Sequence, residues 1–335
     1  MKSSEPGAQW LCLATLLGTG CNSSHKPANA GGVAAGRAAF GKGGRELLRA
    51  AGAICCFITF MGETLPPKPD SGARPLPLAQ WGAAARADVL GVMTDIDDTL
   101  TRDGAIEPAA LDALHALAAV GLPVVAITGR PLGWSLPFAQ AWPVCAIVAE
   151  NGAVAVLREG AVLHTEFVQD EATRAAQALR LQQVAQQILQ QVPGATLAQD
   201  SAGRVTDIAI DHSEFTQLPA VAVQQVVALM QAAGMNASVS SIHINGWFGS
   251  HTKYSAAQWM LQRLFGRELL PEITRWVYVG DSTNDQLMFQ HFPCSVGVAN
   301  LMRFAAELQV WPAYITQAER GEGFAEVARA VLAVR

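Results

Sequence analysis

Blocks of apolar residues alternate with polar segments along most of the chain, and this pattern predicts a sheet flanked by helices. One apolar run begins at Val89 and leads directly into three carboxylates, the first of which is Asp95. Apolar runs of this length bounded by polar residues are typical of buried strands in a parallel sheet. A helix is expected over 108–120 and a second buried strand over 122–127. Strand, helix and strand in this order predict a right-handed crossover between adjacent parallel strands.

The same alternation continues to the C-terminus. The further expected elements are a short helix over 134–142, a strand over 145–149, a hairpin over 153–167, a helix over 253–265, strands over 276–279 and 294–298, and helices near 302–307 and 323–334. Between the hairpin and the helix at 253, the order helix, strand, strand, helix, strand, strand predicts a small α+β layer. This layer has no acidic strand ends of its own, so we interpret it as a lid, and we expect the return hinge at 246–249.

The predicted fold class is therefore α/β, with a Rossmann-like, doubly wound parallel sheet and an inserted α+β domain. We expect a catalytic core over 86–168 and 247–335, and a cap, which is the lid, over 169–246. Residues 1–85 are rich in Gly, Ala, Ser and Pro and lack lasting periodicity, which predicts a disordered extension with a Pro-rich linker. Two alternatives are a leader segment and an over-long gene start, with translation beginning at Met61.

Composition narrows the function classes. The chain has 335 residues, half of them apolar, which leaves room for two domains with large cores. The net charge of −5 comes with no basic face, so nucleic acid is not an expected partner. No apolar run reaches the roughly 18 residues that a membrane span needs, so no membrane association is expected. The six cysteines follow no zinc or redox spacing, which favours a reducing cytosol and a cytoplasmic location.

Asp95 and Asp97 come at the end of the first predicted strand. Open α/β sheets place their chemistry at the carboxyl ends of such strands. Like charges that crowd together are unfavourable unless a cation or a proton offsets them, and a hard dication with oxygen ligands, Mg²⁺ first, is the expected offset. The alternative is an acidic turn in which Asp98 acts only as a cap for the following segment.

Three later segments carry similar signals. Thr128, Gly129 and Arg130 follow the second strand, where the hydroxyl should lie near the carboxylates and the glycine lets the backbone approach an anion closely. Lys253 stands at a predicted helix start, where its charge opposes the helix dipole, and an anion held between them explains that placement. A further acidic strand end, with oxygen-rich side chains, lies at 280–285.

These four clusters, in this order, resemble the motifs of the haloacid dehalogenase superfamily of aspartate-nucleophile phosphatases. The resemblance covers residues 88–335. More than a hundred residues separate the second cluster from the third, which places the cap where the family's type II caps are inserted. The order of its elements resembles the subgroup that includes sucrose-phosphate, trehalose-phosphate and mannosyl-phosphoglycerate phosphatases, the Cof-like sugar phosphatases and eukaryotic-type phosphomannomutase. One departure is Asp98, where the family most often has Gly, and we expect a tuned local turn there.

The resemblance implies roles for individual residues. Asp95 would attack phosphorus and form an aspartyl-phosphate, and Asp97 would act as general acid and then as general base. The implied catalytic residues are Asp95, Asp97, Thr128 and Lys253. The implied metal site consists of Asp95, Asp97 (through its main-chain carbonyl), Asp281 and Asp285, with Mg²⁺ as the cofactor. The implied substrate-binding residues are Thr128, Gly129, Arg130, Asn151, Lys253 and Asn284, with Trp134, Trp247 and His243 as further neighbours of the leaving group.

The expected function is Mg²⁺-dependent hydrolysis of a small phosphorylated metabolite such as a sugar phosphate. One alternative is a phosphomutase of the phosphomannomutase kind, which returns the phosphoryl group to its substrate. Such an enzyme needs several basic cap residues for a second phosphate, and this cap offers only Arg174, Arg180 and Arg204, which favours hydrolysis. A non-catalytic binding protein on the same fold is a third hypothesis. The sequence does not predict the oligomeric state.

Overall fold

The computed structural model describes residues 74–335. The predictions of a leader, of a disordered tail and of a start at Met61 concern residues outside this range. Within the described range, none of the helices has both the length and the apolar character that a membrane crossing requires.

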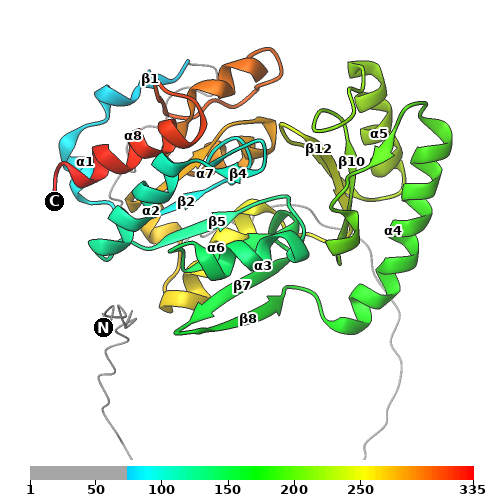
Figure 1. The fold of residues 1–335 in the computed structure, drawn as a ribbon, viewed down its shortest axis with the longest axis horizontal. Coiled ribbons are helices and arrows are strands. Elements are labelled where there is room, and N and C mark those ends of the chain that lie inside the picture. Colours follow the sequence, from blue (N-terminus) through cyan, green and yellow to red (C-terminus); the bar gives the residue numbers. More distant parts are fainter. Residues whose placement is uncertain (1–73) are drawn as a thin grey trace, which may run out of the picture. The chain divides into compact units, whose positions relative to one another are not determined.

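The main sheet carries the core of the described chain (Figure 1). Its strands, in spatial order, are β1 (Leu76–Pro77), β15 (Tyr314–Ile315), β14 (Cys294–Gly297), β13 (Trp276–Gly280), β2 (Gly91–Thr94), β5 (Val124–Ile127), β6 (Ala146–Ala149), β7 (Val154–Glu159) and β8 (Val162–Phe167). Pairing is parallel from β1 to β6, and the hairpin of β7 and β8 adds an antiparallel edge. The five central strands β14, β13, β2, β5 and β6 are buried throughout, which is typical of parallel sheets covered on both faces. The predicted α/β fold class is confirmed.

Helices cover both faces of this sheet. One face packs against α2 (Pro108–Ala119), α3 (Leu132–Ala141) and α8 (Arg320–Leu332), and the other against α6 (Lys253–Phe265) and α7 (Gln286–His291). Consecutive residues of a strand point to opposite faces, so Val92 belongs to the first hydrophobic cluster and Met93 to the second. The helix expected near 302–307 is a 3₁₀ segment, Ala299–Phe304. A two-stranded ribbon, β3 (Thr101–Arg102) and β4 (Ala105–Ile106), follows β2.

Residues 76–85, which the sequence analysis placed in the N-terminal extension, pack against the main sheet instead. β1 pairs with β15, and a 3₁₀ turn (Leu78–Gln80) and helix α1 (Ala83–Ala87) follow it. Leu78 and Trp81 are buried in the first hydrophobic cluster. These two buried side chains, three residues apart, attach the segment to the core. The Pro-rich composition of the segment led the sequence analysis to assign it to the extension instead.

The cap forms a separate four-stranded antiparallel sheet in the order β11 (Asn236–Val239), β12 (His243–Trp247), β10 (Asp207–Asp211) and β9 (Thr196–Leu197). Helices α4 (Glu171–Gln191) and α5 (Ala220–Ala232) pack on it around their own hydrophobic cluster. β12 extends through Trp247, so Gly246 lies inside a strand and not in the expected hinge. A Cβ on Gly246 would lie 2.7 Å from Met230 Sδ, so this glycine allows α5 to pack closely on the sheet.

Candidate active site

The acidic segments meet at the carboxyl edge of the main sheet. Asp95 directly follows β2 and Asp281 directly follows β13, and these two strands are parallel neighbours, with Thr94 opposite Val279. The Asp95 N–H donates to the Val279 carbonyl at 2.8 Å, so the hydrogen bonds between β2 and β13 continue as far as Asp95 itself. The strand-end rule therefore places two residues that are far apart in sequence side by side.

Three buried carboxylates form one cluster at this edge. Oxygen atoms of Asp95, Asp281 and Asp285 all lie within 4.8 Å of one another. Lys253 Nζ donates to Asp95 Oδ1 and to Asp285 Oδ1, both at 2.8 Å, and its side chain is buried. Lys253 is the first residue of α6, whose start is fixed by a capping box between Thr252 and Ser255. The lysine opposes the helix dipole as expected, and the anions that stabilise it are the carboxylates themselves.

The electrostatics of this cluster favour a bound cation. Burial raises the pKa of Asp95 to about 7, although the neighbouring Lys253 lowers it. Burial and the adjacent carboxylates of Asp95 and Asp285 raise the pKa of Asp281 well above its ordinary value. Burial opposes the charge of Lys253, but Asp285 and Asp95 raise its pKa above the usual range. A single ammonium group does not balance three carboxylates, so a divalent ion would remove the remaining penalty.

The hydrogen bonds divide the carboxylates into two roles. Asp281 Oδ1 is buried and has no hydrogen-bond partner within residues 74–335, whereas Asp281 Oδ2 accepts a bond from Asn300 Nδ2 at 3.1 Å. The Asp285 carboxylate is fully engaged. Its Oδ1 accepts from Tyr278 Oη at 2.5 Å as well as from Lys253, and its Oδ2 accepts the backbone N–H groups that follow β13, at 3.0 and 3.2 Å. The oxygen donors fit Mg²⁺, with Asp281 suited to direct ligation and Asp285 suited to orienting the ligands around it.

Asp97 faces a different group of residues. Arg130 Nε donates to Asp97 Oδ1 at 2.9 Å, and Thr128 Oγ1 lies 3.4 Å from Asp97 Oδ2. The carboxylate therefore points toward the loop after β5, and the metal-ligand cluster contains the carboxylates of Asp95, Asp281 and Asp285 without that of Asp97. The expected proximity of the Thr128 hydroxyl to the carboxylates is observed at Asp97.

Gly129 and its neighbours form one of the contacts between the core and the cap. A Cβ on Gly129 would lie 3.2 Å from Asn245 Oδ1 and 3.3 Å from Asn151 Oδ1. The Gly129 carbonyl accepts bonds from Asn245 Nδ2 at 3.2 Å and from an Arg204 nitrogen at 3.0 Å. The glycine therefore permits close approach of two asparagines, one of them from the cap. Asn151 Nδ2 is buried and lacks a hydrogen-bond partner in the described part of the chain.

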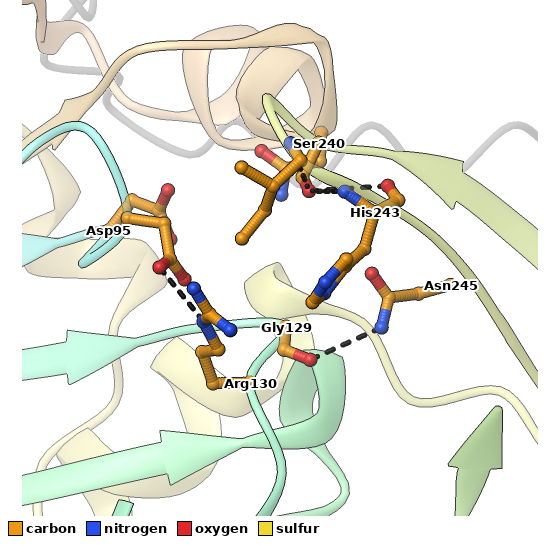
Figure 2. A pocket seen from close by; sticks show the side chains of 9 residues that line it. Asp95, Gly129, Arg130, Ser240, His243 and Asn245 are labelled. Carbon is orange, nitrogen blue, oxygen red and sulfur yellow. Dashed lines mark hydrogen bonds and ion pairs between the residues drawn. The ribbon is translucent and has the colours of Figure 1, made fainter. Parts of the chain in front are cut away.

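A small enclosed cavity lies between Asp95, Asp97 and the cap, and Figure 2 shows core and cap side chains converging on it. Its lining residues are Asp95, Asp97, Gly129, Arg130, Ser240, Ile242, His243, Asn245 and Asn284. The volume of about 10 Å³ holds roughly one water molecule. A substrate larger than that can enter only if the cap moves. His243 and Asn284 line the cavity as expected. Trp247 instead stacks on His251 with ring centres 5.8 Å apart, while Trp134 lies under the Arg130 guanidinium.

The sequence analysis missed several residues of the site. Arg130 also pairs with two cap carboxylates, Asp200 at 3.2 Å and Glu214 at 2.7 Å, and Glu214 accepts a 2.8 Å bond from His243. No local pattern predicts these contacts, because 84 residues separate Arg130 from Glu214. Asn300 is different, because it follows the end of β14 and the strand-end rule would have identified it.

Known proteins resemble this chain in a segment of its sequence and in its fold. Residues 92–221 match the family model of haloacid dehalogenase-like hydrolases. No curated protein matches the sequence. Similar solved structures include the C-terminal domain of a trehalose-6-phosphate phosphatase from C. albicans (TM-score 0.58, 11% identity, 78% of this chain and 100% of that chain). A protein from Plasmodium vivax described as a HAD/COF-like hydrolase gives a TM-score of 0.57 at 17% identity, with 76% of this chain and 99% of that chain covered.

The sucrose-phosphatase of Synechocystis sp. PCC6803, solved with sucrose and phosphate, has a TM-score of 0.51 and 17% identity, over 72% of this chain and 97% of that chain. At these identities the solved structures establish a shared fold. The chain is therefore similar to haloacid dehalogenase-like hydrolases in sequence over residues 92–221, and it shares the fold of these solved structures.

Proposed function

We propose that this protein is a Mg²⁺-dependent phosphatase that hydrolyses a small phosphorylated metabolite, such as a sugar phosphate, through an aspartyl-phosphate. The observation that carries the proposal is the position of Lys253 Nζ, 2.8 Å from both Asp95 and Asp285, in a cluster of carboxylates that also includes Asp281. The likeness to a trehalose-6-phosphate phosphatase and to a sucrose-phosphatase with bound sucrose and phosphate supports the substrate class.

In the first step, a carboxylate oxygen of Asp95 attacks phosphorus, the ester P–O bond breaks, and the leaving alcohol takes a proton from Asp97. In the second step, water attacks the phosphorus of the aspartyl-phosphate, Asp97 accepts a proton from that water, and inorganic phosphate leaves Asp95 as a free carboxylate. Lys253 neutralises Asp95 and then holds a phosphoryl oxygen as charge spreads over the phosphoryl group.

The remaining expected residues would have the following roles. Thr128 Oγ1 and the backbone at Gly129 would bind the phosphoryl oxygens, and Asn284 and Asn151 would contact the substrate from either side. Asp95, Asp281 and the main-chain carbonyl of Asp97 would hold Mg²⁺, and Asp285 would orient that shell. When bound, the ion would offset the charge between the phosphate and the carboxylates.

The phosphomutase alternative is disfavoured by the state of the three cap arginines. Arg174 stacks on Phe167 and Arg180 stacks on Phe248, each with the guanidinium 3.9 Å from the ring centre. Arg204 is held by cap carboxylates. None of the three is poised for a second phosphate. The non-catalytic alternative is disfavoured because all four expected clusters meet at one edge of the sheet.

The test is Asp95→Asn, which keeps the shape of the side chain and removes the nucleophile. Phosphate release from p-nitrophenyl phosphate and from glucose 6-phosphate should fall to background, while the circular dichroism spectrum is unchanged. Release by the unmodified protein should also stop when a chelator removes Mg²⁺. Appreciable turnover by the variant would exclude Asp95 as the nucleophile. The cap boundaries at 169–246 and a cytoplasmic location stay predictions.

A further inference from the structure

Arg130 is shared between the proposed general acid and the cap. Its Nε donates to Asp97, one terminal nitrogen contacts Asp200 at 3.2 Å and Glu214 at 3.4 Å, and the other donates to Glu214 at 2.7 Å. The side chain of Arg130 is 5% exposed, so the guanidinium is buried among three carboxylates. A single positive charge therefore faces three negative ones at the point where the leaving group must lie.

Arg204 is equally committed. Its Nε and one terminal nitrogen donate to Asp200, and the other terminal nitrogen donates to Asp207 at 2.9 and 3.0 Å and to the carbonyl of Gly129. Its side chain is 2% exposed. Around the leaving-group side of the site, two arginines therefore face four carboxylates, and both guanidinium groups already donate to those carboxylates.

The two cap carboxylates keep partners of their own when the cap moves. Glu214 is bound to His243 and Asp200 to Arg204, and all four residues belong to the cap. Although burial raises the pKa of Glu214, the hydrogen bonds from His243 and Arg130 lower it to about 2, so this group is ionised. Because the cavity holds about one water molecule, the cap must part from Arg130 to admit a substrate and then close over it. On closure, the cap brings the carboxyl groups of Glu214 and Asp200 toward the leaving group.

We propose that Glu214 and Asp200 make the cap selective for phosphate esters whose leaving alcohol carries hydroxyl groups and no charge. Ionised carboxylates accept hydrogen bonds from hydroxyl groups and repel a carboxylate or a second phosphate at the same position. On the core side, Asn151 Nδ2 is buried and has no hydrogen-bond partner among residues 74–335, so it would be a donor for a hydroxyl oxygen. This inference rests on the proposed phosphatase function and assigns its specificity to two cap residues.

The experiment compares glucitol 6-phosphate with 6-phosphogluconate, two open-chain esters that carry a hydroxymethyl group and a carboxylate, respectively, at the carbon farthest from the phosphate. The full chain with Mg²⁺ should prefer the neutral ester by about tenfold or more in kcat/KM. In Glu214→Gln the ratio of kcat/KM for the neutral ester to kcat/KM for the anionic ester should fall by about tenfold, because kcat/KM for the anionic ester rises relative to that for the neutral one. The matched control is Glu171→Gln, which removes the same charge from an exposed position at the start of α4 and should leave the ratio unchanged.

Asp200→Asn provides a second test with the same expected direction. Equal hydrolysis of the two esters by the unmodified protein would overturn the inference and leave the phosphatase proposal standing. A ratio that is the same in Glu214→Gln, in Asp200→Asn and in the unmodified protein would also overturn it. Hydrolysis of p-nitrophenyl phosphate serves as the independent measure of phosphatase chemistry, so failure of the proposed function would appear there as loss of all turnover.

Discussion

Replacing Tyr278 by Phe removes one oxygen atom from beneath the acidic cluster. Tyr278 lies in the middle of β13 and is fully buried, and its ring packs against Phe289 and Phe292 with centres 6.1 and 5.7 Å away. A phenylalanine preserves those contacts. The lost hydroxyl donates to Asp285 Oδ1 at 2.5 Å, the same oxygen that accepts from Lys253 Nζ. The variant therefore tests whether Tyr278 fixes the carboxylate that positions the lysine.

A hydrogen bond to a charged group contributes about 1.5–3 kcal/mol to stability. For a domain of this size, each kcal/mol shifts Tm by about 2–4 °C, so Tyr278→Phe should lower Tm by about 3–12 °C. We also expect kcat to fall while KM changes little, because a loosened Asp285 leaves Lys253 less well placed for the transition state than for substrate binding.

Two assays measure these effects: denaturant unfolding for the free energy, and steady-state phosphate release with saturating Mg²⁺ for kcat. Tyr314→Phe is the matched control, because it removes a tyrosine hydroxyl from β15, a short strand of the same sheet that lies between β1 and β14, away from the acidic cluster. If Tyr278→Phe matches the control in both the unfolding free energy and kcat, the Tyr278–Asp285–Lys253 chain has no role in the site and the reasoning fails.

Two further predictions concern the metal and the cap. Burial raises the pKa of Asp95 to about 7 and that of Asp281 well above its ordinary value of 3.8, so between about pH 4 and 7 the metal-free folded state binds protons that the unfolded state has released. Without Mg²⁺, these groups should therefore lower the free energy of unfolding as the pH rises through that window, and the increase in Tm on adding Mg²⁺ should be larger at pH 8 than at pH 5.5. Equal Mg²⁺-induced shifts in Tm at the two pH values would contradict this. The buried Glu150 carboxylate of the core accepts the backbone N–H groups of Val205 and Thr206 from the cap, so Glu150→Gln should speed hydrogen exchange at those two amides. Unchanged exchange there would show that other contacts hold the cap on the core.

The sequence predicted the centre of the site because its residues obey a positional rule. Asp95 and Lys253 are 158 residues apart, yet each stands at the end of a buried strand or at the start of a helix, and the parallel topology brings these positions together. Periodicity located those element ends well, and helix α6 begins at Lys253 as expected. A rule that concerns only strand and helix ends needs no knowledge of side-chain packing.

The residues that the sequence did not reveal act through packing. Tyr278 lies in an uninterrupted apolar strand, so the sequence predicts an ordinary core residue. Nothing in the neighbouring sequence indicates that its hydroxyl donates to a carboxylate. The contact of Arg130 with Glu214 depends on how the cap docks on the core, which no local pattern encodes. The N-terminal boundary of the core was misplaced for a different reason. The prediction relied on the Pro-rich composition of the segment and did not recognise Leu78 and Trp81 as buried core residues.

Asp98 shows how a departure from a family pattern can be explained by the structure around it. The sequence analysis expected a tuned turn where the family most often has glycine, and the residue has φ +55°, in the left-handed region that glycine adopts freely. Aspartate tolerates this region better than most residues. Arg320 Nε forms an ion pair with Asp98 Oδ1 at 2.7 Å, although the angle does not meet the criteria for a hydrogen bond. Asn300 Nδ2 donates to the Asp98 carbonyl at 3.0 Å and also to the Asp281 carboxylate. Asn300 thus links the backbone of the turn to Asp281, the proposed metal ligand. The contacts of Asp98 with Arg320 and Asn300 therefore offset the strain of the turn and hold the loop that carries Asp95 and Asp97 in one conformation.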